Sequence, residues 1–358
     1  MKKTIIPLAL IFGLYSSIFS QTKTMPSTSH RFGFFHLCND GKIAIETKSK
    51  TPDIKVYDFS VKGEFDVPEI SSDVHSTSPV ISDDGKLLFF NQNSYLYVYN
   101  FSTQMPAVLS SRENPKSYPL VCFNNVLTYV SDNGKGKQSI VERDLESGLE
   151  KKILTNQSSI KRNFKPATSD NGRYIVIHSS FINKTNEGLY LLDKQNLSFP
   201  SKISNLKLNE GLEDLWCDVS NTGDVIYVTN TNYDHLFLVK KGESPVQLTK
   251  KSFDGDSPRI SSDGEYVVYL SNGKYKQKSG WSFNDNATGW EYNTRDVHII
   301  KTKSGKSKRL KAAGVSQVEI SPDGEHIVYY TIGQLNYTAN PFIKDKKVKK
   351  QKREIVKF

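Results

Sequence analysis

Histidine, tyrosine and arginine residues recur at intervals along this sequence. Together, these residue types could supply a base that removes a proton and a group that neutralises a carboxylate. A His or Tyr base that removes the proton beside a uronate carboxylate, with an Arg, a His or a metal neutralising that carboxylate, is the set required for β-elimination. The candidate catalytic residues of these types are His75, Tyr118, Arg162, His178, His235 and Arg259. They lie far apart in sequence, so the fold must bring them together.

A second set of side chains suits binding. Exposed aromatic side chains give contact area at a low cost in conformational entropy, and cations can pair with acidic groups. The predicted binding residues are Lys165, His178, Trp216, Arg259, Trp281 and Trp290. The two last lie in the long connection 271–296, where the aromatics among Asn, Asp and Gly suit stacking on sugar rings or a peptide. The alternative for that connection is a hairpin extension that packs its own aromatics.

Several catalytic and cofactor motifs are absent from the sequence. It contains no Gly-x-Ser-x-Gly elbow, no phosphate-binding loop and no dinucleotide fingerprint, so no cofactor is expected. Cys38, Cys122 and Cys217 lack the paired spacing of a zinc site and are interpreted as buried free thiols. The segment 284–289 resembles the start of a calcium loop, but Arg295 stands where the closing Glu is needed. No metal site is predicted.

The elements that position these residues come from an internal repeat. Each copy is a short apolar strand, a polar turn that ends in Gly, and a stronger β-branched and aromatic strand. Asp-Gly and Asn-Gly accept the positive φ that tight hairpins require. The turn positions are 41, 85, 125, 172, 223, 264 and 324, with Asn125 replacing Gly in the third copy. A period of about 45 residues indicates a propeller or a solenoid.

The strand pattern decides between these two architectures. A third and a fourth strand follow most copies, for example 95–100 and 107–109 after the second turn. Four antiparallel strands per repeat make a propeller blade, and no segment has the sustained 3.6-residue period of a helical solenoid. The prediction is an all-β, seven-bladed propeller of four-stranded antiparallel blades over residues 30–343. We expect 355–358 to supply the outer strand of the last blade.

The turn motifs carry a family resemblance. The motifs Ser-Pro-Asp-Gly at 321–324, Ser-Ser-Asp-Gly at 261–264 and Ser-Asp-Asp-Gly at 82–85 resemble the WD-like repeats of TolB-type propellers. The resemblance covers nearly all of residues 30–331. It implies export and partner binding but no particular catalytic residue, because the repeat builds blades and carries no chemistry.

The predicted meander also places the candidate residues. The Asp-Gly turns share one face, and the loops that enter each first strand share the opposite face with those that join strands two and three. We expect the candidates of the first two sets that lie in these loops to surround the channel mouth on that opposite face. For any single residue the alternative is a polar loop side chain without a function.

The two ends of the chain differ from the repeats. Residues 1–20 have a Lys2-Lys3 start, an apolar run and a small-residue exit, which predicts a signal peptide cleaved near Ser20 and a periplasmic or secreted protein. Residues 21–29 are interpreted as a linker, and no later stretch reads as a transmembrane segment. Residues 344–358 hold seven Lys and one Arg against one Asp and one Glu, so they carry more than half of the formal net charge of +10. The basic pI therefore does not predict nucleic-acid binding by the body.

Two functional hypotheses remain open at this stage. The first is a monomeric, non-enzymatic propeller that binds an envelope protein or a polysaccharide at the channel mouth. The second is a polysaccharide lyase that acts on an ulvan- or oligogalacturonate-type substrate, a chemistry that some secreted propellers perform. A third interpretation, docking of the Lys-rich end to acidic lipids or glycans, competes with a solvated loop.

Overall fold

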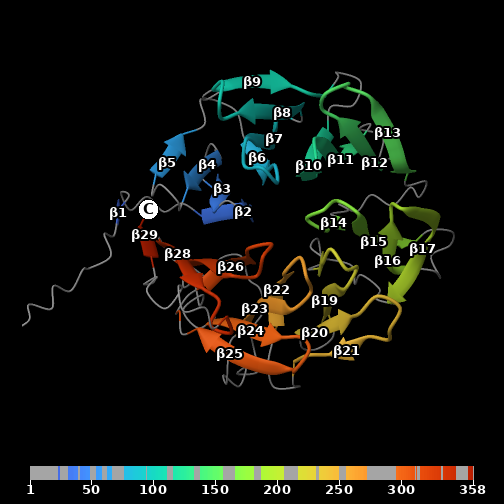
Figure 1. The fold of residues 1–358 in the computed structure, drawn as a ribbon, viewed down its shortest axis with the longest axis vertical. Helices are drawn as coiled ribbons and strands as arrows, with labels where there is room; N and C mark the ends of the chain where they lie inside the picture. The colour runs from blue at the N-terminus through green and yellow to red at the C-terminus, as the bar shows by residue number, and fades with distance from the viewer. Residues whose placement is uncertain are drawn as a thin grey trace, which may run out of the picture.

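Seven antiparallel sheets of four blade strands each are arranged radially around a central axis (Figure 1). This computed structural model describes residues 23–24, 31–38, 41–48, 54–58, 63–66, 76–93, 95–110, 116–132, 138–155, 166–180, 187–204, 217–230, 234–249, 255–271, 296–310, 312, 315–331, 334–343 and 354–357. Every regular element among them is a strand. The prediction of an all-β, seven-bladed propeller is confirmed.

Each blade is a meander whose strands run from the channel outward in chain order. Blade 1 is formed by β2 (Arg31–Leu37), β3 (Lys42–Lys48), β4 (Ile54–Asp58) and β5 (Gly63–Asp66). Blade 2 is formed by β6 (Ser76–Ile81), β7 (Leu87–Gln92), β8 (Tyr95–Asn100) and β9 (Met105–Val108). Blade 3 is formed by β10 (Lys116–Phe123), β11 (Val126–Asp132), β12 (Gln138–Asp144) and β13 (Glu150–Thr155). Blades 4 and 5 are formed by β14 (Ala167–Thr168), β15 (Tyr174–Ser180), β16 (Glu187–Asp193), β17 (Asn196–Ser204); and β18 (Cys217–Val219), β19 (Val225–Asn230), β20 (Asp234–Val239), β21 (Val246–Gln247). Blades 6 and 7 are formed by β22 (Gly255–Ile260), β23 (Tyr266–Ser271), β24 (Asp296–Lys301), β25 (Lys306–Leu310); and β26 (Val315–Ile320), β27 (His326–Thr331), β28 (Gln334–Ala339), β29 (Glu354–Lys357).

The repeated turn is held by one serine. In blade 6 the Ser261 hydroxyl accepts a hydrogen bond from the Tyr266 amide at 3.0 Å and donates one to the Asp263 carboxylate at 2.6 Å. The turn then needs a left-handed residue, which Gly264 supplies at φ +74°. In blade 3 Asn125 takes this role at φ 59°, because Asn tolerates this region better than most residues. The degenerate third copy therefore still makes the predicted turn.

The hydrophobic core is divided among the blade interfaces. Seven clusters of buried apolar residues lie among the described residues, and each joins two neighbouring sheets. Large side chains such as Phe89, Phe90 and Ile175 are almost fully buried in them. One cluster packs Ile43 and Ile45 of blade 1 on Val328 of blade 7 and so closes the ring.

The last blade combines segments from both ends of the described chain. Strand β29 pairs antiparallel with β28, with Leu335 opposite Val356, and is the fourth strand of blade 7. Strand β1 (Lys23–Thr24) adds a fifth strand, parallel to β29 (Figure 1). This added strand covers part of a sheet edge that would otherwise present unpaired backbone groups.

Candidate functional site

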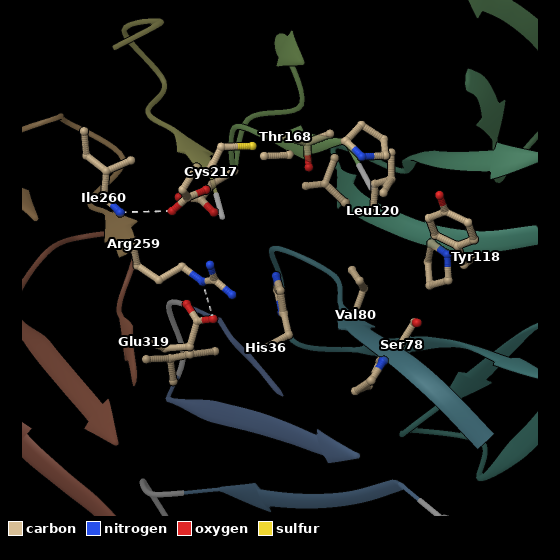
Figure 2. A pocket seen from close by; sticks show the side chains of 18 of the residues that line it. His36, Ser78, Val80, Tyr118, Leu120, Thr168, Cys217, Arg259, Ile260 and Glu319 are labelled. Carbon is tan, nitrogen blue, oxygen red and sulfur yellow. Dashed lines mark hydrogen bonds and ion pairs between the residues drawn. The ribbon is translucent and has the colours of Figure 1, made fainter. Parts of the chain in front are cut away.

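A cavity of about 250 Å³ occupies the centre of the ring, where the innermost strands of the blades converge (Figure 2). One sequence position of the repeat, five residues before the turn glycine or its Asn125 equivalent, lines the cavity in every blade. These seven ring residues are His36, Val80, Leu120, Ala167, Asp218, Arg259 and Glu319. The ring is divided in two: blades 2 to 4 contribute aliphatic side chains, and blades 5, 6, 7 and 1 contribute charged or polar ones.

Irregular inner strands give the ring residues their direction. The register between the first two strands shifts between Asp256 and Arg259 in blade 6, and between Thr77 and Val80 in blade 2. Ser257 and Ser78, each followed by a proline, have φ values of 50° and 56° at these irregularities. A bulge bends a strand and redirects its side chains. In both blades the ring residue follows directly after the irregular segment.

Arg259 is the one cationic side chain among the described residues that line the cavity. Its Nε donates to Glu319 Oε1 at 2.6 Å and its Nη1 donates to the Pro258 carbonyl at 3.0 Å. Burial opposes the charged guanidinium, but the carboxylates of Glu319 and Asp218 outweigh burial and hold the pKa of Arg259 above its ordinary value. Arg259 is therefore a permanent cation that Glu319 already neutralises.

Asp218 provides a second carboxylate on the polar side of the ring. Its Oδ2 accepts from the Ile260 amide and its Oδ1 accepts from the Val219 amide, both at 2.9 Å. Burial raises the pKa of Asp218 to about 7, although Arg259 and the Ile260 amide act in the opposite direction. Asp218 therefore changes charge near neutral pH. Two bonds leave lone pairs of this carboxylate unused, because a carboxylate offers about four acceptor positions.

A third carboxylate, Asp170, lies in the turn of blade 4 and also lines the cavity. It accepts a hydrogen bond from the Ser262 hydroxyl of blade 6, which links two turns across the end of the channel. Burial raises the pKa of Asp170, and burial likewise raises the pKa of Glu319 against the effect of Arg259. The directions of these shifts agree with a desolvated site that holds more acids than bases.

His36 completes the polar side of the ring as a neutral group. Its Nδ1 accepts from the Ile81 amide at 3.3 Å, which places the proton of the neutral imidazole on Nε2. Burial, and secondly the charge of Arg259, lower the pKa of His36 to about 4. Cys217 also lines the cavity, but burial raises the pKa of its thiol to about 12, so it is not a thiolate nucleophile at neutral pH.

The structure brings two of the predicted site residues together in this cavity. Tyr118 of β10 and Arg259 of β22 both line it, although both lie within inner strands rather than in the entry loops expected at the mouth. His235 lies in β20, the third strand of blade 5, and does not line the cavity. His178 lies in β15, and its side chain is outside the described part. The remaining candidates also lie outside the described residues: His75, Arg162, Lys165, Trp216, Trp281 and Trp290.

Sequence reasoning missed the acidic half of the cavity. Asp218, Glu319, Asp170 and His36 were not among the predicted site residues. For three of them the signal was present, because the turn glycines fix the register of the repeat and the ring position lies five residues before each glycine. Reading that one column across seven copies would have found the ring.

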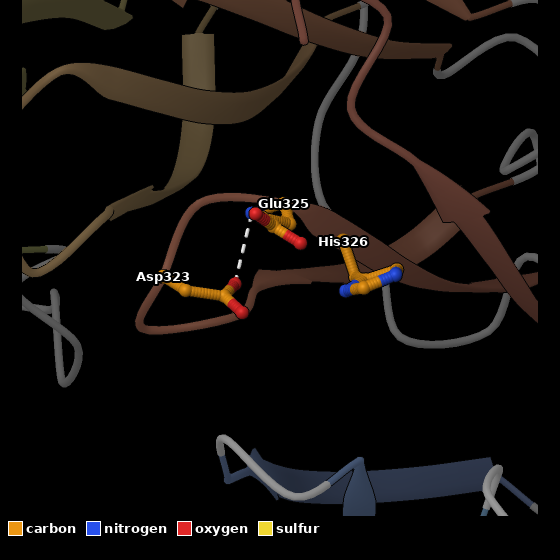
Figure 3. A group of neighbouring side chains, drawn as sticks. All are labelled: Asp323, Glu325 and His326. Atoms are coloured by element: carbon orange, nitrogen blue, oxygen red, sulfur yellow. Dashed lines mark hydrogen bonds between the residues drawn. The ribbon is translucent and has the colours of Figure 1, made fainter. Parts of the chain in front are cut away.

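An acidic group with one histidine lies outside the channel, at the turn of blade 7 (Figure 3). The ligand atoms of Asp323, Glu325 and His326 lie within 4.8 Å of one another. The Asp323 carboxylate, however, accepts from the Ser321 hydroxyl and from the Glu325 amide, as Asp263 does in the equivalent turn of blade 6. His326 stacks on Tyr337 with ring centroids 4.8 Å apart. The repeat turn and this stacking account for the grouping without a metal.

The site and fold define the chain as a β-propeller with a chemically divided central cavity. No protein-family model matches the sequence, and no curated protein matches it in sequence. Among solved structures, an oligogalacturonate lyase in complex with manganese is 11% identical with a TM-score of 0.57, covering 83% of this chain and 85% of the lyase. A prolyl endopeptidase is 13% identical with a TM-score of 0.60, and the match spans 91% of this chain but about half, 49%, of the endopeptidase.

TolB from Acinetobacter baumannii is also similar in structure, at 14% identity and a TM-score of 0.46 over 90% of this chain and 83% of TolB. Identities this low relate the folds only. None of the described residues forms a helix long and apolar enough to cross a membrane.

Proposed function

We propose that this chain is a binding propeller that takes part of a partner molecule into its central cavity. The observation that carries the proposal is the ring of seven residues, one from each blade, which surrounds a cavity of about 250 Å³ with one polar and one aliphatic side. Ligand sites are typically concave and largely apolar, with a few convergent polar groups that fix orientation. The predicted signal peptide supports a periplasmic or secreted location, where the partner would be an envelope protein or a glycan.

The lyase alternative has less support from the same cavity. Tyr118 and Arg259 are a base and a cation of the required types, and both line the cavity. Arg259, however, is already paired with Glu319, and the carboxylates of Asp218 and Asp170 would repel a uronate. Incubation of the purified protein with oligogalacturonate, followed by ultraviolet absorbance of unsaturated uronate, tests this alternative. Steady formation of unsaturated product would support the lyase alternative.

The binding proposal is tested by filling the cavity. Ligand-observed NMR of the purified chain with a panel of peptides and neutral and acidic oligosaccharides would first find a binding molecule. Leu120→Trp places a larger side chain in the ring, and Leu149→Trp is the matched control, because Leu149 is 73% exposed at a turn. Binding should be lost in Leu120→Trp and kept in Leu149→Trp. Equal binding by both variants would place the ligand elsewhere and refute the proposal.

A further inference from the structure

The balance of charge in the cavity points to the chemistry of its ligand. Of the described residues that line it, three are carboxylates, Asp170, Asp218 and Glu319, and one is a cation, Arg259. Glu319 is bonded to Arg259, and Asp218 also feels the charge of Arg259, so three carboxylates share one cation. A desolvated carboxylate whose charge is only partly balanced is costly and tends to take up a proton. A cation placed among these groups would relieve that cost.

The donors that face the cavity do not reverse this conclusion. The Nη2 of Arg259 makes no hydrogen bond to any described residue, and His36 carries its proton on Nε2, so both could donate to an acceptor. Figure 2 shows the two side chains directed into the same space. An anion there would have to compete with Glu319 for Arg259 and would add a further negative charge to a site that already holds three carboxylates and one cation. A neutral acceptor atom or a water satisfies these donors without that penalty.

The aliphatic half of the ring indicates the chemistry of the rest of the ligand. Val80, Leu120 and Ala167 present aliphatic surface, and Pro119 and Pro166 lie beside them in the cavity lining. An apolar cavity of about 150 Å³ is large enough to bind benzene, so about 250 Å³ admits a somewhat larger group. Apolar atoms of a ligand that leave water for this wall gain free energy in proportion to the surface they bury.

We propose that the central cavity binds a protonated amine carried on a compact apolar body, with the ammonium group at Asp218 and the apolar body against Val80, Leu120 and Ala167. This inference rests on the proposed function and names the ligand class of that site. The amine has two sources of the same chemistry: a free small molecule, or a lysine side chain of a partner protein. Asp218 has a pKa of about 7, so a bound cation would favour its charged form and binding would release a proton near neutral pH.

The test uses three probes of one shape and different charge: 3-methylbutylammonium, 3-methylbutan-1-ol and 3-methylbutanoate. Titration of the full mature chain, followed by NMR, should give at least tenfold tighter binding of the ammonium probe than of either other probe. Its affinity should rise by roughly 25-fold from pH 5.5 to pH 7.5, because the site must lose a proton from a group with a pKa of about 7. Equal or tighter binding of the alcohol or the carboxylate would overturn the inference, and so would no binding of the ammonium probe.

Variants test whether the preference for the ammonium probe arises at the ring residues. Asp218→Asn should weaken ammonium binding at least tenfold and reduce its pH dependence. Asp263→Asn is the matched control, since Asn171 fills the equivalent turn position in blade 4 and Asp263 lies outside the cavity lining. If Asp218→Asn unfolds, the pH dependence of the wild-type chain still decides.

Two further comparisons complete the test. An acetylated peptide with a single lysine separates the two sources, since tighter binding than the small amine indicates a protein partner and no binding indicates a small molecule. Tight binding of the carboxylate probe that Leu120→Trp abolishes would refute the amine but leave the proposed function intact.

Discussion

The half-buried carboxylate of Asp218 should make the unfolding free energy depend on pH in a way that one substitution removes. The folded chain holds the pKa of this group at about 7, against 3.8 for an unperturbed aspartate. Well below pH 3.8 the group is protonated in both states and has no effect. Between pH 4 and pH 7 the unfolded chain loses this proton while the folded chain keeps it. Stability therefore falls as pH rises and levels off above the folded pKa.

The size of this effect follows from the two pKa values. A difference of about three pKa units corresponds to about 4 kcal/mol, at 1.36 kcal/mol per unit. The groups that face Asp218 also titrate or carry charge: Arg259, Glu319, Asp170, His36 and Cys217. Comparing wild type with Asp218→Asn at each pH cancels much of their own contribution. The substitution also replaces one carboxylate oxygen, which accepts from a backbone amide, by an NH2 group that cannot accept, and that cost does not vary with pH.

Urea unfolding of both proteins at intervals from pH 4 to pH 8 measures the difference. The stability of Asp218→Asn relative to wild type should improve steadily from pH 4 to pH 7, by about 3.4 kcal/mol in all, whatever its constant offset. Asp263→Asn, which changes a carboxylate exposed on the turn and outside the cavity lining, is the matched control. A flat difference between pH 4 and pH 8 would refute the assignment of Asp218 as a desolvated acid that Arg259 compensates only in part.

Three further predictions concern the fold. Ser261→Ala should lower the unfolding free energy by about 1–3 kcal/mol in urea titrations, because the Tyr266 amide and Asp263 lose their partner. Ser261→Cys should lower the unfolding free energy by less, since Cys38 and Cys122 occupy this position in two other copies of the repeat. Equal losses for the two variants would contradict that reasoning. Gly264→Ala should lower the thermal midpoint more than Gly305→Ala: both have positive φ, but only at 264 would a Cβ meet a neighbour, Asp224 Oδ2 at 2.9 Å. Truncation after Arg353 removes β29 and should speed hydrogen exchange in 334–337; unchanged exchange there would mean that the β28–β29 pairing contributes no protection.

The fold was predictable because its information is local and repeated. Each blade needs a residue with positive φ between two strands, and Gly264 or Asn125 marks that need within a few letters of sequence. The outer strands of some blades were also visible, as at Ile355 and Val356, because alternation of apolar residues directly follows a charged stretch. The number of blades then follows from counting turns.

The site was less predictable because its information is distributed. Loop residues were favoured as ligands because loops commonly carry function, yet Arg259 and Tyr118 reach the cavity from strands. The irregular segment before Arg259 redirects the strand, and a bulge leaves no clear mark in one sequence. The pairing of Arg259 with Glu319 spans 60 residues, so no local pattern could reveal it.

The polar ring residues also hold the ring together, which ties binding to stability. Asp218 of blade 5 accepts from the Ile260 amide of blade 6, and Arg259 of blade 6 donates to Glu319 of blade 7. His36 of blade 1 accepts from the Ile81 amide of blade 2. Each bond therefore crosses one blade interface at the edge of the cavity. Substitution of a polar ring residue removes both a ligand group and such a link, whereas substitution of Leu120 changes the cavity alone. For this reason alanine substitutions around the ring cannot separate binding from the stability of the propeller. The pH dependence of stability in Asp218→Asn and the larger side chain of Leu120→Trp can separate the two.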